Sequence, residues 1–403
     1  MGSKFARLWT ASTISNLGDG IVFAAFPLIV ASITRDPIAV SVFAFSLRLP
    51  WLVLALPAGV VADRFDRRWL MIGADVSRVA ILGLLGLVLV GGDPPLAALY
   101  AVGFLLGAAE TVFDSSAEAF LPALVEPDRL NHANGQLVGA RWVANSFVGP
   151  PLGALLFVVG TALPVFVDGL TFAIAAVLVL SIDGTYVADG SRAGSFRDDV
   201  REGITWLWRQ RLLRTLALMA GFYNLVVFGM VAILVLFVQD EVGLGNVGYG
   251  LILSALGVGG FLGGFLADWY VERFGEGSAL ILTILIAATA ATTMGFTSSA
   301  LVVGAMIFLF GIATTLWNVV AISLRQELTP DPLRGRVAAA SKMIAYGAEP
   351  IGALVGGLVA AWVGLRGPML VAGAGLALMV MVVLPIVNET QVEAARARAG
   401  ENP

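Results

Sequence analysis

Long apolar stretches alternate with short turns that contain charged, Pro or Gly residues along almost the whole chain. Each stretch is about 20 residues or longer, which is the length that a helix needs to cross the hydrocarbon core of a bilayer. A helix is the expected form, because in lipid every spanning segment has to satisfy its own backbone hydrogen bonds. The pattern predicts an all-α membrane protein with twelve spans, at about 8–33, 38–62, 68–91, 95–120, 131–158, 162–182, 213–238, 245–268, 277–297, 300–325, 334–361 and 366–388.

The segment from Asp183 to about Arg211 is more polar than the rest. Within it, apolar residues recur at near-helical spacing, at Phe196, Val200, Ile204, Leu207 and Trp208. This stripe predicts an amphipathic helix on the membrane surface, whereas a simple tether between halves would not need it. We therefore expect a six-helix bundle over 1–182, a connector over 183–212, and a second bundle with a short tail over 213–403.

Composition excludes a soluble protein, since 58% of residues are hydrophobic and only 13% are charged. The chain has no Cys, and its one His, His132, falls in a predicted loop, so neither cysteine chemistry nor a histidine relay is expected. Phosphate-binding loops, metal-ligand clusters and nucleophile–base pairs are also missing from the sequence. We predict that the protein is not an enzyme, needs no cofactor or metal, and has no nucleic-acid partner.

Lys and Arg lie mainly at one set of span ends, from Lys4 and Arg7 to Arg396, while the opposite set holds only Arg35 and Arg366. Because cytoplasmic loops carry the excess of these residues, both termini and the connector are predicted to be cytoplasmic, in the inner membrane of a cell. An even number of spans agrees with this, since it places both termini on one side.

The two halves repeat each other at three places. The offsets are 205, 203 and 199 residues by subtraction, for the pairs Gly59-Val-Val-Ala-Asp63 with Gly264-Phe-Leu-Ala-Asp268, Pro127-Asp128 with Pro330-Asp331, and Pro151-Leu-Gly-Ala with Pro350-Ile-Gly-Ala. Three echoes in register indicate pseudo-symmetric six-helix bundles, an arrangement typical of secondary transporters with a substrate site between the repeats.

Several of these motifs resemble the major facilitator superfamily. Gly59-x-x-x-Asp63-Arg64-x-x-Arg67-Arg68 is similar to its loop 2–3 signature, and Val148-Gly149-Pro150-Pro151-Leu152-Gly153 to the span-five motif of its drug/proton antiporters. The run from Leu121 to Leu130 and the run Arg334-Gly-Arg-Val resemble the branch of macrolide efflux proteins and the enterobactin exporter. The resemblance covers essentially the whole chain and implies the major facilitator fold, alternating access and export.

The same resemblance implies a cytoplasmic gate around the loop 2–3 signature. A carboxylate at a helix end can pair with Arg and accept from the start of a neighbouring helix. Ordinary positive-inside charge is the alternative interpretation. The predicted gate residues are Gly59, Asp63, Arg64, Arg67, Arg68 and Glu118, with a weaker counterpart at Gly264, Asp268 and Arg273.

Ionisable residues inside spans are costly unless they are paired or face water, so they mark candidate functional sites. Glu110, Asp114 and Glu118 share one helical face, because four residues advance only about 40° around a helix. Desolvation and like charge oppose ionisation of all three, so we expect at least one to hold a proton at neutral pH. The resemblance implies that spans one, four, seven and ten line a cavity, which makes Asp19, Glu110 and Asp114 the candidate proton acceptors.

A static charge network with Arg48, Arg141 and Glu349 is the alternative role for these carboxylates. Asp75 and Arg78, three residues apart, are predicted to be a structural pair. Span four lacks the arginine that drug/proton antiporters often carry there, so Arg48 or Arg141 would have to take its place.

Two further sets complete the candidate residues. Gly149, Pro150, Pro151 and Gly153, with Pro350 and Gly352 in the second half, predict helix bends and close backbone approach. Tyr223, Asn224, Phe228, Trp317 and Asn318 are candidates for the wall of a large, mostly apolar cavity, although such residues also serve as lipid-facing or packing material.

These predictions together indicate a monomeric exporter of an amphipathic organic compound, such as a drug, macrolide or siderophore, driven by protons across a lipid bilayer. A transporter that imports a nutrient or moves a lipid is the first alternative. A non-transporting membrane protein is the second, and it would need a catalytic group or soluble domain that the sequence does not offer.

Overall fold

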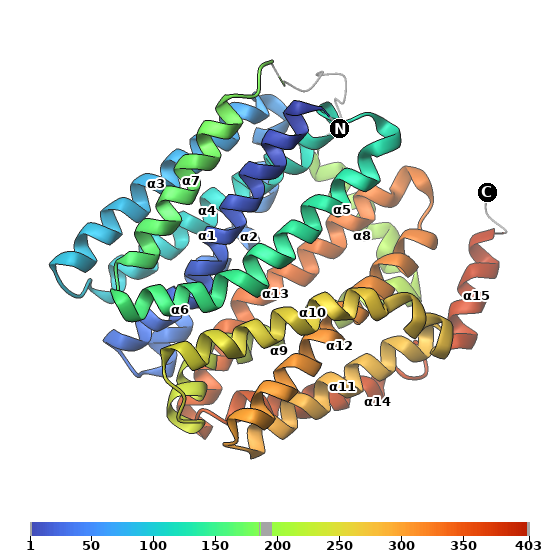
Figure 1. The fold of residues 1–403 in the computed structure, drawn as a ribbon. Helices are drawn as coiled ribbons and strands as arrows, with labels where there is room; N and C mark the ends of the chain where they lie inside the picture. Colours follow the sequence, from blue (N-terminus) through green and yellow to red (C-terminus); the bar gives the residue numbers. More distant parts are fainter. Residues whose placement is uncertain (1, 185, 187–195, 401–403) are drawn as a thin grey trace. The chain divides into compact units, whose positions relative to one another are not determined.

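The computed structural model describes residues 2–184, 186 and 196–400, and within these residues it contains helices and no strands (Figure 1). The predicted connector 183–212 therefore lies partly outside the described residues. The described chain forms two compact units. The first comprises α1 to α7 together with residues 244–254, and the second comprises α8, α9, the remainder of α10 and α11 to α15.

Seven α-helices make up most of the first unit. They are α1 (Ser3–Ile33), α2 (Pro37–Arg64), α3 (Arg67–Gly91), α4 (Leu96–Phe120), α5 (Leu130–Arg141), α6 (Gly149–Val159) and α7 (Leu163–Leu180), with short 3-10 turns at Leu121–Ala123 and Pro127–Arg129 and a π-helical segment at Trp142–Val148. Helix α1 packs on α6 and α7, and α3 packs on α4 and α7, so the fifth and sixth predicted spans close around the first (Figure 1).

The second unit follows the same order. Its helices are α8 (Phe196–Arg209), α9 (Arg211–Leu236), α10 (Asn246–Phe274), α11 (Glu276–Phe296), α12 (Ala300–Glu327), α13 (Arg334–Val363), α14 (Gly367–Val383) and α15 (Glu389–Gly400), with a π-helical segment at Phe237–Glu241 and a 3-10 turn at Asp331–Leu333. Helix α13 packs along α9, as α6 packs along α1 in the first unit.

Eleven helical segments in the described chain are long and apolar enough to cross a membrane, and the shorter apolar helix α14 brings the set to the predicted twelve. Large apolar side chains are exposed along them, with Trp362 at 87% and Leu301 at 83%. Such surfaces are unfavourable in water and suited to lipid, so the protein is a multi-pass membrane protein.

The fifth span is interrupted where Gly149 precedes two prolines. Pro150 and Pro151 have no N–H to donate, and the helix before them widens so that Gly149 N donates to Ala144 O, five residues back. In the eleventh span, α13 continues through Pro350 as one α-helix. A single proline removes one backbone hydrogen bond, which the α-helix accommodates here without a change of type.

Small residues allow close backbone approach in both units. A Cβ on Gly153 would overlap Ile21 O of α1, and a Cβ on Gly352 would overlap Leu225 O of α9. The two contacts occupy corresponding places in the repeat, at α6 on α1 and at α13 on α9. Close helix crossings of this kind maximise dispersion contacts where the hydrophobic effect between helices is absent.

Helix α8 forms where the apolar stripe predicts a helix, and it packs on α13 and α9, with Leu207 fully buried. A Cβ on Gly203 would overlap Arg336 O, and Arg336 Nη1 lies 2.6 Å from Glu202 Oε2. Leu207 of the apolar stripe is therefore covered by protein, whereas Trp208 is 46% exposed.

The tail of the second unit ends in a docked helix. Glu389 at the start of α15 accepts a hydrogen bond from Gly277 N. This N–H lies in the first turn of α11, where backbone donors have no partner within their own helix. Arg396 Nε donates to Glu327 Oε1 at 2.6 Å, and Nη2 lies 2.9 Å from Glu276 Oε2. The hydrogen bond that Arg396 donates to Glu327 raises the pKa of Arg396 above its ordinary value, so this clamp stays charged at every physiological pH.

We expect Gly153→Ala and Gly352→Ala each to destabilise the protein by about 1–3 kcal/mol, because the new methyl group overlaps a backbone oxygen. Gly139→Ala in α5 and Gly335→Ala in α13 are matched controls, since a Cβ at either position would have no atom within 4 Å. Alanine at these controls should be neutral or stabilise by about 0.5–1 kcal/mol. Thermal unfolding of the detergent-solubilised variants measures both effects, and equal midpoints for all four would contradict the packing argument.

Candidate functional site

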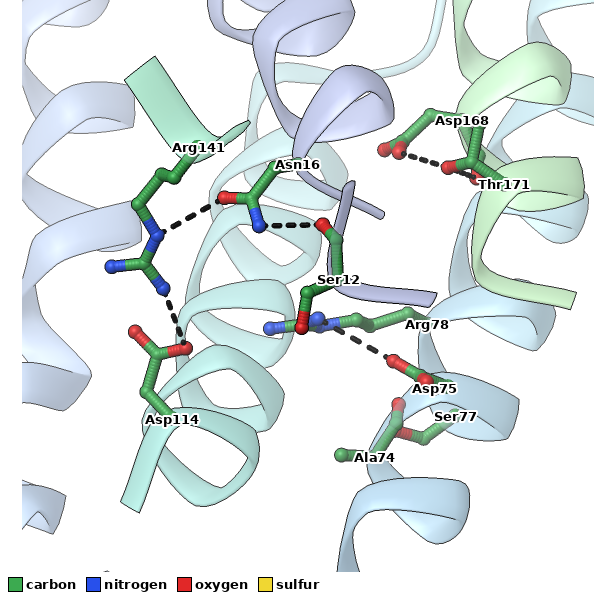
Figure 2. Close-up of polar contacts among 10 residues, drawn as sticks. All are labelled: Ser12, Asn16, Ala74, Asp75, Ser77, Arg78, Asp114, Arg141, Asp168 and Thr171. Carbon is green, nitrogen blue, oxygen red and sulfur yellow. Dashed lines mark hydrogen bonds and ion pairs between the residues drawn. The ribbon is translucent and has the colours of Figure 1, made fainter. Parts of the chain in front are cut away.

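Arg141 joins three helices in the first unit. Its Nη2 lies 3.4 Å from Asp114 Oδ1 on α4, and its Nε donates to Asn16 Oδ1 on α1 at 3.1 Å. Asn16 in turn donates through Nδ2 to Ser12 O at 2.6 Å (Figure 2). The Arg141 side chain is 56% exposed and that of Asp114 is 19% exposed, so the pair borders accessible space and is not sealed in the core.

A second polar group lies deeper in the same unit. Arg78 is 2% exposed, and its Nη1 is 3.6 Å from Oδ1 of Asp75, which is fully buried. The guanidinium also stands over the rings of Phe172 and Phe113, at 4.6 and 5.3 Å from their centroids. Arg78 lies about 16 Å along α3 from its first residue, at 1.5 Å per residue, which is near the middle of a hydrocarbon core about 30 Å thick.

Asp168 on α7 is a further buried carboxylate, with 1% exposure. Thr171 Oγ1 donates mainly to the backbone O of Asp168 at 2.7 Å, and its contact with Asp168 Oδ1 is longer, at 3.3 Å. A Cβ on Gly18 would overlap the same Oδ1, so this carboxylate sits directly against the backbone of α1.

Asp19 follows Gly18 on α1 and is half-buried. Its electrostatic neighbours include Arg78, Arg141 and Asp114. Glu110, also half-buried, belongs to the same neighbourhood, one turn before Asp114 on α4, whereas Glu118 is exposed near the end of that helix. The structure thus brings the three predicted proton acceptors into one electrostatic group within the first unit.

The remaining members of the predicted charge network lie apart along the chain. Arg48 is half-buried on α2, and Glu349 is 5% exposed on α13. Arg48 belongs to the first unit and Glu349 to the second.

Two arginines at the start of α3 interact with the ends of other helices. Arg67 Nη1 donates to Ala119 O at the end of α4, and Arg68 donates to Val179 O and Leu180 O at the end of α7. Cations at these positions satisfy terminal carbonyls and oppose the negative end of the helix dipole. The side chain of Asp63 lies outside the described residues, and Arg64 is exposed at the end of α2.

In the second unit, the prediction that a helix ends at Asp268 is wrong. Helix α10 continues to Phe274, so Asp268 is an exposed residue inside the helix. Arg273 stacks over Phe274 at 5.8 Å from the ring centroid. No Cβ contact within 4 Å is found at Gly264, so nothing in the described chain requires glycine there.

Two of the predicted cavity residues are packing residues. Tyr223 and Trp317 are 3% and 4% exposed, their rings stack at 5.7 Å, and Tyr223 Oη shares a 2.6 Å hydrogen bond with Thr314 Oγ1. Asn224 is half-buried and Asn318 exposed, and each donates to a backbone carbonyl, of Ala345 and Thr314 respectively. Phe228 is half-buried on α9.

A cavity of about 710 Å³ opens between the beginnings of α1 and α5. It combines apolar, aromatic, amide and charged side chains, which are Phe5, Ala6, Trp9, Asp128, Arg129, His132 and Gln136. Trp9 Nε1 donates to Gln136 O at 3.3 Å across this space. His132, which was expected in a loop, lies in α5, because the helix begins at Leu130.

Sequence reasoning missed Asn16, Asp66 and the depth of the Asp75–Arg78 pair. Asp66 caps α3 by accepting from Arg68 N at 3.0 Å and also accepts from Tyr186 N at 3.2 Å. Its position just before a helical run was a usable signal, since Asp is a preferred N-cap residue. Nothing in the sequence pattern shows that Asp168 and Arg78 belong to one neighbourhood. Among the described residues, no group of His, Cys, Asp and Glu could hold a metal ion.

Comparison with known proteins agrees with a transporter. A family model described as transmembrane secretion effector matches residues 2–401. The multidrug efflux pump Tap of Mycolicibacterium fortuitum is 29% identical over 401 residues, covering 94% of this chain and 95% of that protein. Macrolide efflux protein A of Streptococcus pyogenes is 24% identical over 396 residues, covering 96% of each.

Solved structures show the same fold at low sequence identity. A bacterial homologue of the iron transporter ferroportin in its inward-facing state has a TM-score of 0.74 at 20% identity, covering 96% of this chain and 99% of that one. The nucleoside transporter NupG has a TM-score of 0.72 at 12% identity, with the same coverage.

We expect Arg68→Gln to lower the stability of the protein by about 1–2 kcal/mol, because several terminal carbonyls lose a charged donor. Arg129→Gln is the control, since Arg129 is 58% exposed and its contact with Glu126 is 3.8 Å long, a type of pair that contributes little. Thermal unfolding in detergent compares the two. A larger effect at Arg129 would contradict the assignment of Arg68 as a helix-end clamp.

Proposed function

The chain belongs to the transmembrane secretion effector family of the major facilitator superfamily, and we propose that it exports an amphipathic organic compound, such as a drug, macrolide or siderophore, by proton-coupled alternating access. The family and the fold make the protein a membrane transporter. We propose in addition the direction of transport, the class of substrate and the coupling to protons.

Export is favoured by the relatives that match over almost the whole chain. Two of them are named as a multidrug efflux pump and a macrolide efflux protein. An amphipathic substrate also suits the cavity between α1 and α5, where Phe5 and Trp9 offer apolar surface and Asp128 and Gln136 offer polar groups. We propose that this cavity contributes to the substrate path.

The observation that carries proton coupling is the carboxylate group around Arg141. Asp19, Glu110 and Asp114 lie in one electrostatic neighbourhood, and Asp114 pairs with an exposed Arg141. Carboxylates in such a place exchange protons with the accessible space more easily than sealed ones, yet their mutual repulsion and partial burial favour proton binding.

The arrangement suggests how binding and protonation exclude each other. An ionised Asp114 attracts Arg141, or a cationic substrate that takes its place. A proton on Asp114 removes that attraction and frees the guanidinium to stay with Asn16, with which it shares a hydrogen bond. A carboxylate that has to release the substrate before it binds a proton makes the two compete, which is the condition for antiport. Arg48 and Glu349 are proposed as further counter-charges.

We propose that a gate lies where α3 begins, next to the ends of α4 and α7. Arg67 and Arg68 already clamp α4 and α7, so a movement of this end has to act on the helices that carry Asp114 and Asp168. We propose that Gly59, Asp63, Arg64 and Glu118 act with them. The lysine and arginine distribution favours a cytoplasmic location for this end and for both termini, in the inner membrane. We propose that the protein works as a monomer.

We expect inverted vesicles that contain the protein to accumulate a fluorescent lipophilic cation when a proton gradient is imposed. Asp19→Asn and Asp114→Asn should reduce this accumulation to the level of vesicles without the protein, since each removes a proton acceptor. Asp93→Asn, an exposed residue between α3 and α4, is the control and should transport like the wild type.

Expression levels of all variants have to match for this comparison. Full accumulation by both variants would refute proton coupling through these carboxylates. Wild-type vesicles that show no accumulation of any amphipathic cation would refute drug export and direct the search to a nutrient or lipid substrate.

A further inference from the structure

The junction between α8 and α9 in the second unit carries charge that the proposed transport mechanism does not use. Helix α8 ends at Arg209 and α9 begins at Arg211, and only Gln210 between them is non-helical, with φ −91° and ψ 102°. Arg209, Arg211 and Arg214 lie within six residues of one another. The junction is therefore strongly basic.

Two of these guanidinium groups have no partner in the protein. Arg209 and Arg211 are exposed, and neither side chain makes an ion pair or a hydrogen bond with any residue that the structure describes. Glu202, the nearest acid before them along the chain, is already paired with Arg336 at 2.6 Å. The next acid after them is Asp240, at the far end of the seventh span. The junction thus presents uncompensated positive charge to its surroundings.

Hydrogen bonds fix the backbone of the junction. Gln210 N donates to Leu207 O at 3.1 Å, and Arg214 N donates to Gln210 O at 2.9 Å. Arg214 Nη1 also donates to Trp208 O at 3.2 Å, so this third arginine is used within the junction itself. Leu207 is fully buried and anchors the end of α8 against protein. The two exposed arginines therefore project from an ordered turn.

The junction lies at the level of the lipid head groups. The seventh span, Arg211–Glu241, has 31 residues and is about 45 Å long at 1.5 Å per residue, which exceeds a hydrocarbon core of about 30 Å. Its charged ends therefore extend into the head-group regions. Trp208, just before the span, is 46% exposed, and tryptophan is enriched at this depth because its ring is apolar and its N–H is polar.

Beyond the junction, the same side of α9 is apolar. Leu218 is 49% exposed and Phe222 is 38% exposed. Arg211, Leu218 and Phe222 follow one another at intervals of seven and four residues, so they lie on one face of the helix, with Leu218 about 10 Å along it from Arg211. A ligand with an acidic head group and a hydrocarbon chain matches this order of charge and apolar surface.

A soluble anion fits this surface less well than a lipid does. Exposed arginines contribute little to an ion pair in water, where salt screens the attraction. A phospholipid is held at this depth by its acyl chains, so its head group is present near the arginines at high local concentration. Arginines next to a spanning helix attract anionic lipids for this reason.

We propose that Arg209 and Arg211 bind the head group of an anionic phospholipid, such as phosphatidylglycerol, with Trp208 beside the head group and an acyl chain along Leu218 and Phe222. The ligand belongs to the surrounding bilayer and is not a transported substrate. The inference rests neither on the proposed direction of transport nor on proton coupling.

Native mass spectrometry of the full-length protein in detergent micelles, titrated with phosphatidylglycerol, measures the binding of single lipid molecules. Arg209→Gln and Arg211→Gln should each weaken binding about fivefold, which corresponds to the contribution of one arginine near an anionic membrane surface. The double variant should bind neutral phosphatidylcholine like the wild type. Since neither arginine has a protein partner, the variants should unfold at the wild-type temperature when no lipid is added.

Arg201→Gln is the matched control. Arg201 is also exposed and belongs to the same helix, but it lies about 12 Å along α8 from Arg209. This separation is greater than the Debye length of about 8 Å at physiological salt. The control variant should therefore bind phosphatidylglycerol like the wild type, although it loses the same charge.

Three outcomes would overturn the proposal. Equal weakening by Arg201→Gln and Arg209→Gln would show that the attraction comes from diffuse charge. Equal binding of phosphatidylcholine and phosphatidylglycerol to the wild type would show that the head-group charge is not recognised. Displacement of the lipid by inorganic phosphate at the same concentration would show that the arginines bind a soluble anion. None of these outcomes depends on the vesicle assay, which tests the proposed function.

Discussion

The cost of placing charge in a low-dielectric interior governs the polar architecture of this protein. One group of electrostatic neighbours in the first unit lies on helices that otherwise have to be compatible with lipid, and it comprises Asp19, Asp75, Glu110, Asp114, Asp168, Arg78 and Arg141. The two guanidinium groups are held by contacts from other helices, with Asp114 and Asn16 around Arg141 and two aromatic rings around Arg78. The number and position of bound protons then become part of the folded structure, because a proton is the smallest compensating charge available.

Close helix packing makes these positions possible. Glycine at positions 18, 20, 149 and 153 lets α1 approach α6 and α7 until backbone atoms touch, which brings Asp19 next to the buried Asp168. The contacts at Gly352 and Gly356 on α9 repeat this arrangement in the second unit, although no comparable set of acids accompanies them among the described residues there. Both units therefore share the close glycine contacts between helices, whereas the group of acids is found in the first unit.

Arginine serves different purposes at different depths. At helix ends, Arg67, Arg68 and Arg396 bind carbonyls or exposed carboxylates, and they hold elements together at modest energetic gain. In the interior, Arg78 is sealed between aromatic rings and acts as a permanent counter-charge. An arginine at the edge of the unit ties helices together, whereas an arginine at its centre interacts strongly with nearby charges. The difference arises because the dielectric constant is lower in the centre.

The sequence by itself determined the helical membrane class, the twelve apolar segments, the repeat and the family, since hydrophobic length and local motifs carry that information. It also identified the acids of α1 and α4, because charges inside apolar stretches stand out. Only the tertiary structure decided which charges meet. It buried the predicted Asp75–Arg78 pair, with the guanidinium over the ring of Phe172. It also stacked Tyr223 on Trp317 and buried Leu207 of α8. These outcomes depend on helix rotation and crossing, which are fixed by side-chain packing between segments far apart in the chain and leave no periodic trace within any one of them.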